Sequence, residues 1–399
     1  MSRGPWLTIV GLGEDGPDGL SPASRAAVET AEIVMGPPRH LALIPDTPGE
    51  RLKWPTPFTD GLPLLKALRG RKVVVLASGD PFWFGAGRAI AHAFDPEEFV
   101  SMPGHSTFSL AANRLGWPIE DTVCLGLHAT PIERLRPHLS PGCRALVLLR
   151  DGAAVTELAD FLAREGFGNS RVTALEAIGG ARERVTSFAA DAIPTIEFAH
   201  PLAAAIEVAG QGAVLPLVSG IDDLWFQNDG QITKRPVRAL ALSALSPRRG
   251  DCLWDIGGGS GSIAAEWCLT HPNVPAISIE PRKDRASTIR ANAARFGLTN
   301  LRTVEGVAPD CLVGLPAPSA VFIGGGLTED LLADLVERLD QGVRLVAHAV
   351  TLETEALLTS SAARHGGDLM RIELSETGHL GRKRGWKAAY PVVQWRVTL

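Results

Sequence analysis

Residues 251–262, which read Asp-Cys-Leu-Trp-Asp-Ile-Gly-Gly-Gly-Ser-Gly-Ser, constrain the fold of this chain more than any other stretch. A short apolar run reaches an acid and then breaks into glycine, and residues 263–269 continue like the start of a helix. This order predicts a buried strand, a glycine turn and a helix N-terminus. Open α/β folds bind nucleotide-like ligands at such a turn, so we expect a ligand site there.

The spacing of these glycines narrows the kind of ligand. The turn reads Asp255-x-Gly257-x-Gly259-x-Gly261, whereas a dinucleotide fingerprint needs Gly-x-Gly-x-x-Gly and a glycine where Ser262 stands. The observed form is the pattern of S-adenosylmethionine methyltransferases. Glu280 ends the next predicted strand, roughly 20 residues past the turn, where an acid can accept hydrogen bonds from both ribose hydroxyls. The pattern therefore favours a sulfonium cofactor over a dinucleotide.

Composition excludes several other classes. A chain of 399 residues is too long for one ordinary core, so two or three domains are expected. The net charge of -5 gives no general attraction to nucleic acid or to an anionic membrane, and no apolar run is long enough to span a bilayer. The N-terminus leads straight into a predicted strand, so no signal peptide is expected. Five scattered cysteines predict neither a disulfide framework nor a metal site, and a cytoplasmic location follows.

The N-terminal half repeats the order of strand, glycine turn and helix. Buried strands are predicted to end at three turns, residues 11–19, 79–81 and 103–106, and none of these is a Walker A motif. His105 in the third turn is open to three readings: a turn residue, an acid-base group or a ligand contact. The glycines and absent periodicity of residues 209–213 mark a domain boundary. We therefore expect one domain over residues 1–209 and a second over 212–399.

The C-terminal half is predicted to form a seven-stranded, Rossmann-like sheet. Five parallel strands are expected, beginning with the run before Asp255, and an antiparallel hairpin closes the sheet around a basic loop. A dinucleotide fold would instead have six parallel strands. The remaining predicted strands are Ala276–Glu280, Leu301–Glu305, Ala320–Ile323, Val343–Ala349 and the closing pair Leu369–Leu374 and Ala388–Val397.

Both halves resemble known families. Residues 1–209 resemble the two-lobed tetrapyrrole methylases through Val10-Gly-Leu-Gly-Glu-Asp-Gly16, Ala31-Glu-Ile-Val-Met-Gly36, Gly79-Asp-Pro-Phe82 and Pro103-Gly-His-Ser106. Many members have a Gly-x-Gly-Pro-Gly turn, and Glu14-Asp15-Gly16 here is similar to the cobalamin branch that methylates carbon 5. Residues from 212 resemble its partner class I methyltransferase through Gly230-Gln-Ile-Thr-Lys-Arg-Pro-Val-Arg238, Asp255–Gly261 and Phe322-Ile-Gly-Gly325. Their order on one chain resembles the fused precorrin-6Y (precorrin-6B) methyltransferase family of cobalamin biosynthesis.

This resemblance implies an enzyme with two S-adenosylmethionine sites per chain. The first domain is expected to methylate carbon 5 of the tetrapyrrole. The second is expected to methylate carbon 15 and to remove carbon dioxide from the ring C acetate, so that precorrin-6B becomes precorrin-8X. A homo-oligomer is expected because many relatives of both halves assemble. No catalytic acid or base is assigned.

The resemblance also implies the site residues. Substrate contacts are expected from a basic cluster in the closing loop, which can bind carboxylates, and from two glycines at the end of the fourth strand. The cofactor residues are Thr233, Gly257, Gly258, Gly259, Ser260, Gly261, Glu280 and Ala308 in the second domain, and Asp80, Ser106, Thr107 and Ala177 in the first. The substrate residues are Arg382, Lys383, Arg384, Gly324 and Gly325.

Two alternatives stay open from the sequence. One is a methyltransferase pair that acts on a different tetrapyrrole. The other is a single catalytic domain joined to a relative that only senses the cofactor. Glycine turns are intact in both halves, which argues against a decayed domain.

Overall fold

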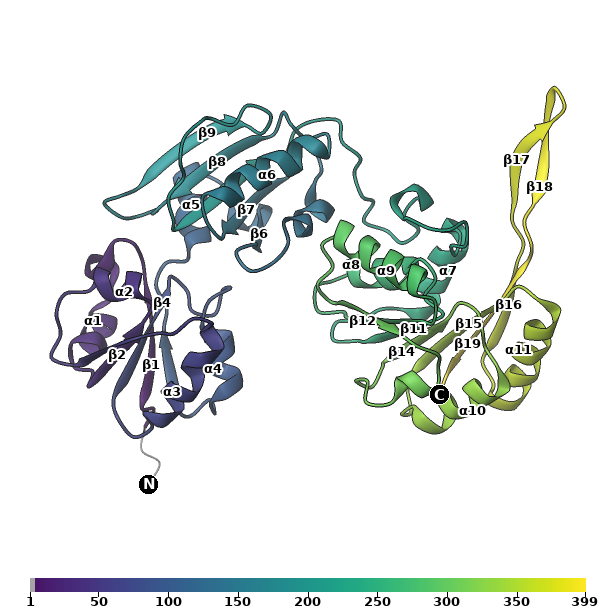
Figure 1. Ribbon diagram of the computed structural model, residues 1–399, viewed down its shortest axis with the longest axis horizontal. Helices are drawn as coiled ribbons and strands as arrows, with labels where there is room; N and C mark the ends of the chain where they lie inside the picture. The colour runs from purple at the N-terminus through teal and green to yellow at the C-terminus, as the bar shows by residue number, and fades with distance from the viewer. Residues whose placement is uncertain (1–3) are drawn as a thin grey trace. The chain divides into compact units, whose positions relative to one another are not determined.

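The computed structural model describes residues 4–399, which form two compact units (Figure 1). The first unit comprises the chain up to residue 132 together with residues 138–213, and the second comprises residues 133–137 and 214–399. Short 3₁₀ segments lie at Gly16–Gly19, Phe58–Asp60, Ile119–Asp121, Ile132–His138, Asp223–Trp225 and Asp310–Leu312. Each unit has its own sheets and its own buried core, and each is described by itself.

The first lobe of unit 1 is a five-stranded parallel sheet in the order β3-β2-β4-β1-β5. Its central strand β4 is buried on both faces: Val73 and Val75 pack towards α3 and α4, whereas Val74 and Leu76 pack towards α1 and α2. The elements are β1 Leu7–Leu12, α1 Pro22–Glu29, β2 Ile33–Gly36, α2 Pro38–Leu43, β3 Glu50–Lys53, α3 Gly61–Ala67, β4 Val73–Ser78, α4 Gly87–Ala93 and β5 Phe99–Met102.

The second lobe of unit 1 is a mixed sheet in the order β6-β7-β10-β8-β9. Only β6 and β7 pair in parallel, and the other neighbours are antiparallel. Phe108 and Ala111 of α5 pack on one face of this sheet against Leu146 and Leu175. The elements are α5 Thr107–Leu115, β6 Val123–Gly126, β7 Arg144–Leu149, α6 Ala153–Arg164, β8 Arg171–Glu176, β9 Arg184–Ala189 and β10 Leu202–Glu207.

Unit 2 is built on a seven-stranded sheet in the order β13-β12-β11-β14-β15-β19-β16. The first five strands are parallel, and β19 runs antiparallel to β15 and β16. The elements are α7 Arg235–Leu245, β11 Leu253–Ile256, α8 Ser262–Leu269, β12 Ala276–Glu280, α9 Lys283–Arg295, β13 Leu301–Glu305, β14 Ala320–Ile323, α10 Glu329–Arg338, β15 Arg344–Ala349, α11 Leu352–His365, β16 Asp368–Ile372, β17 Ser375–Leu380, β18 Lys383–Ala388 and β19 Val392–Thr398.

Alternation along β11 explains why helices cover both faces of this sheet (Figure 1). Leu253 packs with α7 and α8 on one side. Trp254 and Ile256 pack on the other side with α10 and α11. The predicted α/β architecture, with a two-lobed N-terminal part and a seven-stranded C-terminal sheet, is confirmed.

The predicted basic loop between the closing strands is wrong. Residues 375–380 and 383–388 are the strands β17 and β18, which form a separate two-stranded sheet joined by a turn at residues 381–382. Gly378 lies opposite Gly385 and Thr377 opposite Trp386, so the glycines sit within a ladder instead of opening a loop. This hairpin extends from unit 2 beyond its sheet (Figure 1).

Candidate functional site: two glycine-lined ligand sites

The glycine turn after β11 depends on backbone conformations that favour glycine. Gly257, Gly259 and Gly261 have φ angles of 72°, 59° and 73°. Most residues with a Cβ are strained in this left-handed region. Gly257 and Gly258 both donate their backbone N–H to the carbonyl of Ile279, at 2.9 and 3.0 Å, which ties the turn to β12.

Two of the glycines allow close packing underneath the turn. A Cβ on Gly258 would lie 2.0 Å from the hydroxyl of Ser278, and one on Gly261 would lie 2.8 Å from the side chain of Ile289. Gly259 differs, because its Cβ position has no neighbour closer than 3.9 Å. The turn is thus packed against β12 and α9, while backbone at Gly259 faces open space that a ligand can occupy.

The carboxylate of Glu280 lies at the end of β12 beside this open position. Its Oε2 accepts the N–H of Gly259 at 2.9 Å, and its Oε1 accepts the N–H of Arg282 at 3.0 Å. A carboxylate has about four acceptor positions, so two stay available for hydroxyl donors. The geometry therefore suits recognition of a ribose diol.

Asp255 lies beneath the turn and is 1% exposed, and Glu280 is buried almost as fully at 3%. Ser278 donates its hydroxyl to Asp255 Oδ2 at 2.9 Å. Burial raises the pKa of Asp255 to about 7; the Ser278 hydrogen bond opposes this rise and the charge of Glu280 adds to it. The two acids therefore differ in their partners: Asp255 is bound by the Ser278 hydroxyl of β12, whereas Glu280 is bound by the backbone N–H of Gly259 in the turn itself.

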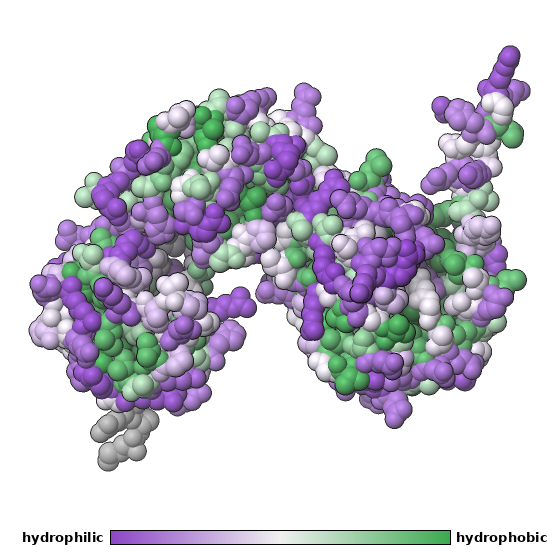
Figure 2. Space-filling model, viewed as in Figure 1, coloured by the Kyte–Doolittle hydropathy of each residue, from purple (hydrophilic) through white to green (hydrophobic). Residues whose placement is uncertain are grey.

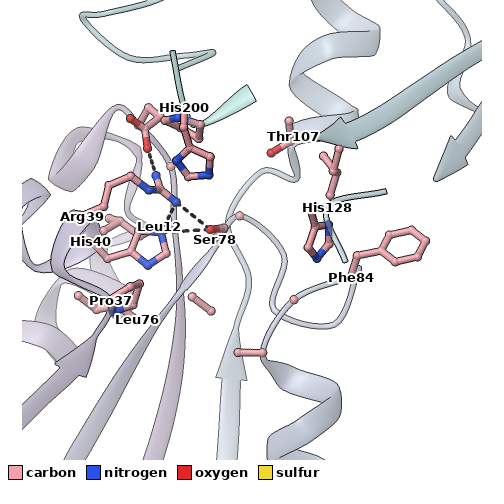
Figure 3. Close-up of a pocket in the computed structure, with 18 of the residues that line it drawn as sticks. Leu12, Pro37, Arg39, His40, Leu76, Ser78, Phe84, Thr107, His128 and His200 are labelled. Atoms are coloured by element: carbon pink, nitrogen blue, oxygen red, sulfur yellow. Dashed lines mark hydrogen bonds and ion pairs between the residues drawn. The ribbon is translucent and has the colours of Figure 1, made fainter. Parts of the chain in front are cut away.

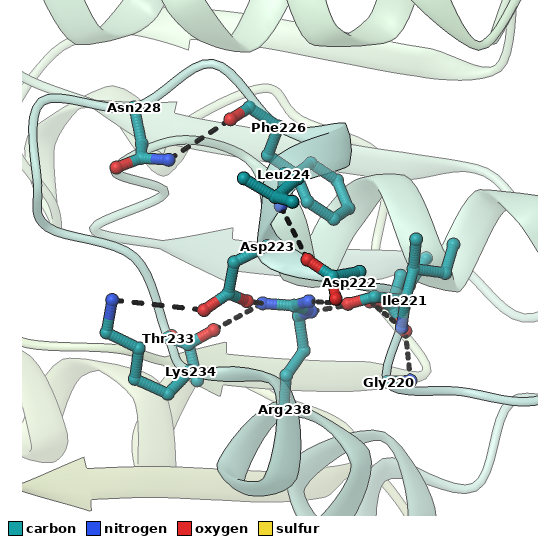
Figure 4. A network of polar contacts seen from close by, with 11 residues as sticks. Gly220, Ile221, Asp222, Asp223, Leu224, Phe226, Asn228, Thr233, Lys234 and Arg238 are labelled. Carbon is teal, nitrogen blue, oxygen red and sulfur yellow. Dashed lines mark hydrogen bonds and ion pairs between the residues drawn. The ribbon is translucent and has the colours of Figure 1, made fainter. Parts of the chain in front are cut away.

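A buried arginine fixes the segment that precedes α7 (Figure 4). The side chain of Arg238 is fully buried and forms ion pairs with Glu266 and, at 3.0 Å, with Asp223. It also donates to the carbonyls of Ile221 and Thr233. Glu266 is satisfied further by backbone N–H groups of residues 220 and 221. Because every charge in this network is paired, it holds Thr233 in a defined place.

The segment held in this way passes over the glycine turn. The carbonyl of Gln231 is the neighbour at 3.9 Å from the Cβ position of Gly259, two residues before Thr233. Arg285 of α9 holds the Gln231 side-chain carbonyl at 2.7 Å, and Asn292 donates at 2.8 Å to the carbonyl of Ser260. The structure therefore brings Thr233, Ser260 and the glycines into one neighbourhood.

The other predicted residues at the ends of the parallel strands lie in adjacent loops. Ala308 lies in the loop after β13, where Gly306 donates its N–H to the Glu280 carbonyl at 3.3 Å. After β14, the carbonyl of Gly325 is 3.0 Å from the Cβ position of Gly257, and Gly324 donates to the carbonyl of Ile256 at 3.2 Å. Because parallel strands end at one edge, these loops surround the same opening.

The basic residues of the closing segment lie in a hairpin that leaves this same edge of the sheet, because Val393 at the start of β19 pairs with Ala349 at the end of β15. Lys383 and Arg384 begin β18 and Arg382 is in the turn of the hairpin, so all three occupy its end. Hydrophilic residues cover that end in Figure 2. The β16–β19 pair that carries the hairpin lies at the sheet edge several strands from β11. The turn after β11 and the base of the hairpin therefore lie at one edge of the sheet, three strands apart, and the basic cluster occupies the far end of the hairpin.

Unit 1 has a second set of turns at the ends of β1, β4 and β5. These three strands are neighbours in the order β4-β1-β5, so their turns meet. Gly79 donates its N–H to the carbonyl of Leu12 at 3.0 Å, and Gly104 donates to that of Gly79 at 3.0 Å. A Cβ on Gly11 would lie 1.9 Å from the Gly79 carbonyl oxygen. Glycine is therefore required for the turns to meet so closely.

A cavity of about 580 Å³ opens beside these turns between the two lobes of unit 1 (Figure 3). Thr107 lines it, together with His105 of the same turn. Asp80 accepts the N–H of Phe82 at 2.8 Å, and Ser106 caps α5 by accepting the N–H of Ser109 at 3.0 Å. Ala177 has a φ of 43° and donates to the Pro201 carbonyl at 2.9 Å. Among the predicted residues of unit 1, Thr107 thus faces the cavity, whereas Asp80, Ser106 and Ala177 have structural contacts beside it.

Sequence reasoning missed a polar cluster on one wall of this cavity. Figure 3 shows the guanidinium of Arg39 between His40, Ser78 and His200, with Thr107, His128 and Phe84 across the cavity. Arg39 Nη2 lies 2.8 Å from His40 Nε2 and 3.1 Å from the Ser78 hydroxyl. The available signal was the run Gly36-Pro-Pro-Arg-His40, which ends the strand next to β4 in the same way as the glycine turns.

Three histidines that line the cavity have lowered pKa values, which favours their neutral forms near pH 7. Burial, and then the adjacent Arg39 cation, lower the pKa of His40 to about 4. The same two causes lower the pKa of His200, and burial lowers that of His128. Arginine keeps its proton in proteins, so Arg39 carries the positive charge of the wall.

Two further properties concern the described residues, 4–399. In that range, no helix has both the length and the apolar composition needed to cross a membrane. The same range holds no group of three or more His, Cys, Asp or Glu side chains placed to bind a metal ion.

Comparison with known proteins gives two family matches, one in each unit of the chain. Residues 6–193 match the tetrapyrrole (corrin/porphyrin) methylases, and residues 224–399 match the precorrin methyltransferase domain. Together with the glycine-lined sites, these matches define an S-adenosylmethionine-dependent methyltransferase made of two units.

Relatives that match nearly the whole chain show which family of methyltransferases it belongs to. The chain is 49% identical over 399 residues to a precorrin-6Y C(5,15)-methyltransferase [decarboxylating] from a Sinorhizobium species, covering 99% of this chain and 96% of that protein. It is 37% identical to the protein of the same name from Mycobacterium tuberculosis strain H37Rv, covering 98% and 99%. A shorter relative, a cobalt-precorrin-6B C(15)-methyltransferase (decarboxylating) from Salmonella typhimurium, is 31% identical over 177 residues, which is 43% of this chain and 91% of that protein. The chain belongs to the family of decarboxylating precorrin-6Y C(5,15)-methyltransferases.

Proposed function

We propose that the two units divide two methylations of one precorrin in cobalamin biosynthesis. Unit 1 methylates carbon 5, and unit 2 methylates carbon 15 and removes carbon dioxide from the ring C acetate, so that precorrin-6B becomes precorrin-8X. The observation that carries the proposal is the match of nearly the whole chain to a relative named for both positions and for decarboxylation. The Salmonella relative supports the division, because it has the length of one unit and its name gives carbon 15 and decarboxylation without carbon 5.

Each unit has a site whose residues fit S-adenosylmethionine, which supports two sites per chain. In unit 2, Gly259 leaves room for close backbone approach and Glu280 keeps free acceptor positions for ribose hydroxyls. Thr233, Ser260, Ala308 and the remaining glycines of the turn surround this place. In unit 1, the three meeting turns and Thr107 border a cavity of about 580 Å³. We assign the cofactor to these two places.

Methyl transfer from this cofactor depends more on the alignment of the reacting atoms than on a strong base. When bound, the cofactor supplies an electrophilic methyl group, and the meso carbons of a reduced tetrapyrrole are enamine-like nucleophiles. The work of this chain is then to hold the ring carbon in line with the methyl group and to exclude water. Gly324 and Gly325, beside Gly257, allow a flat substrate to approach that point closely in unit 2.

Decarboxylation and methylation at carbon 15 share the unit 2 site in this proposal. Loss of carbon dioxide needs an electron sink, which a protonated conjugated imine within the macrocycle provides. The electrons released help to form the nucleophile for the second methylation. The test is mass spectrometry of the products of the full-length Gly325→Ala variant given precorrin-6B, because a Cβ at Gly325 has no protein neighbour within 4 Å and alters only the place assigned to the substrate. We expect loss of carbon dioxide and methylation at carbon 15 to slow by the same factor; unchanged loss of carbon dioxide with slowed methylation at carbon 15 contradicts the shared site.

The partners follow from the same assignment. The substrate is a polycarboxylate tetrapyrrole, no nucleic acid or membrane takes part, and the enzyme works in the cytoplasm. A homo-oligomer is supported by the β17–β18 hairpin, whose Leu380 and Trp386 are 71% and 77% exposed, with Tyr390 88% exposed just after it. An isolated two-stranded hairpin is marginally stable in water, so a second copy of the chain is a suitable cover for it.

Sedimentation of the full chain tests this assembly. We expect a multimer for the natural sequence and a smaller species after Trp386→Ser and Tyr390→Ser are combined. The substitution Leu352→Ser is the control, because Leu352 is 78% exposed but lies on α11, outside the hairpin. Equal sedimentation of all three proteins argues against the hairpin as the interface.

A further inference from the structure

The cavity of unit 1 has an unbalanced charge on one wall. Its lining includes one carboxylate, Glu14, and two arginines, Arg39 and Arg150. Arg150 is already paired with Asp151 at 2.8 Å and with Glu157 at 3.1 Å. The lining histidines His40 and His200 have lowered pKa values, which keeps them neutral. The net charge of this wall therefore depends on Glu14 and on the arginines that surround it.

Glu14 is shared by two arginines. Its side chain is 7% exposed and pairs with Arg39 on one oxygen and with Arg182 on the other, the latter at 3.1 Å. One carboxylate cannot neutralise two guanidinium groups, so one positive charge is left over at the wall. The side chain of Arg182 is 64% exposed and that of Arg39 is 26% exposed, so both keep donors that face outward.

The shared ion pair joins the two lobes at the rim of the cavity. Arg39 belongs to α2 and Glu14 to the turn after β1, both in the first lobe. Arg182 lies in the turn between β8 and β9 of the second lobe. There the backbone carbonyl of Glu14 lies 2.7 Å from the Cβ position of Gly180, so the two turns touch. A group bound by both arginines is therefore placed at the boundary between the lobes.

We propose that Arg39 and Arg182, bridged by Glu14, form the site that binds one carboxylate side chain of the tetrapyrrole in unit 1. Guanidinium groups bind carboxylates through two parallel hydrogen bonds, which fixes orientation as well as position. His40 and Ser78 contact Arg39 from the cavity side and orient its guanidinium. The pair of arginines acts as a positioning device that sets which edge of the macrocycle, and so which meso carbon, faces the methyl donor. This inference rests on the proposed carbon 5 activity of unit 1.

The test uses full-length variants and follows each methylation separately by mass spectrometry, with the substrate precorrin-6B varied. For Arg39→Gln we expect the KM for carbon 5 methylation to rise about tenfold to a hundredfold, the cost of one charged hydrogen-bond partner. The KM for carbon 15 methylation should stay unchanged. Arg182→Gln should act in the same direction with a smaller effect, and Arg39→Lys should restore part of the loss.

Arg71→Gln is the matched control, because Arg71 is also an ion-paired arginine of unit 1, bound to Glu32 and Glu50, but lies outside the cavity lining. Calorimetry with S-adenosylhomocysteine reports whether each variant still binds the cofactor product as the natural chain does. An unchanged KM in Arg39→Gln overturns the carboxylate site. A fall in carbon 5 kcat alone, with unchanged KM, also overturns it and assigns Arg39 a purely structural role. Absence of carbon 5 methylation in the natural chain contradicts the proposed function instead.

Discussion

The carboxylate of Glu280 accepts the backbone N–H of Gly259 at 2.9 Å, which links the end of β12 to the most open position of the glycine turn. One acid thus orders the turn and still has acceptor positions free for a ligand. The same contact gives Glu280 a role that a surface acid at a strand end lacks.

Replacing Glu280 should weaken cofactor binding in unit 2 alone. We expect Glu280→Ala to lower the affinity for S-adenosylhomocysteine about tenfold to a hundredfold at one of two sites, because a hydrogen bond to a charged group contributes about 1.5–3 kcal/mol. Isothermal titration calorimetry measures both sites. Glu305→Ala is the control, since Glu305 ends the neighbouring strand β13 and pairs with Arg290 on the surface. Equal weakening at both sites would show that the two units are coupled.

Asp255 should make the stability of unit 2 depend on pH. Burial raises the pKa of Asp255 to about 7 from an ordinary value of 3.8, so the folded chain holds a proton that the unfolded chain has released. The free energy of unfolding therefore falls as the pH rises from about 4 to 7, by about 4 kcal/mol or less, and is level above that window. In Asp255→Asn this fall should vanish. Urea unfolding at several pH values checks it, and parallel curves for the two proteins contradict it.

Arg238 should be one of the most costly single side chains to remove. Arg238→Met leaves Glu266 buried without its cation, and breaking a buried pair from one side costs about 3–5 kcal/mol. The double variant with Glu266→Met removes both charges and should recover part of the loss. Denaturant unfolding compares the three proteins. If the double variant is no more stable than the single one, the cost comes from the carbonyls that Arg238 binds and not from the unpaired acid.

Replacing two glycines at the unit 2 site with alanine should have different effects, one on stability and the other on catalysis. A Cβ on Gly258 meets the Ser278 hydroxyl at 2.0 Å, so Gly258→Ala should lower the free energy of unfolding by about 1–3 kcal/mol. A Cβ on Gly325 meets nothing within 4 Å, so Gly325→Ala should fold normally. If Gly325 borders the substrate, this second variant should raise the KM for carbon 15 methylation and leave that for carbon 5 methylation unchanged. Thermal unfolding and steady-state kinetics separate the two effects.

The strand and turn pattern of unit 2 was predictable because it is local. Mostly apolar runs of four to six residues predict β11, β12, β14 and β15, since strands covered by helices on both faces are buried at nearly every position. The half-exposed strand β9, which reads Arg-Val-Thr-Ser-Phe-Ala, was missed because its burial depends on its partner β8. The sequence predicts a loop in place of the hairpin β17–β18 because two glycines interrupt it, and only cross-strand pairing shows that they face each other.

The sequence by itself determined the type of each ligand turn and the order of the two units, since glycine spacing and the acids after it are properties of neighbouring residues. It placed the residues of the unit 2 site at strand ends, and parallel pairing brings strand ends to one edge. Only the tertiary structure showed that Glu14, Arg39 and Arg182 meet, because they lie in one helix and two turns that belong to two different lobes. Only the tertiary structure showed that the basic cluster of residues 382–384 lies at the end of a hairpin, three strands along the edge from the glycine turn, because strand order and cross-strand pairing, and not sequence distance, decide where a segment lies.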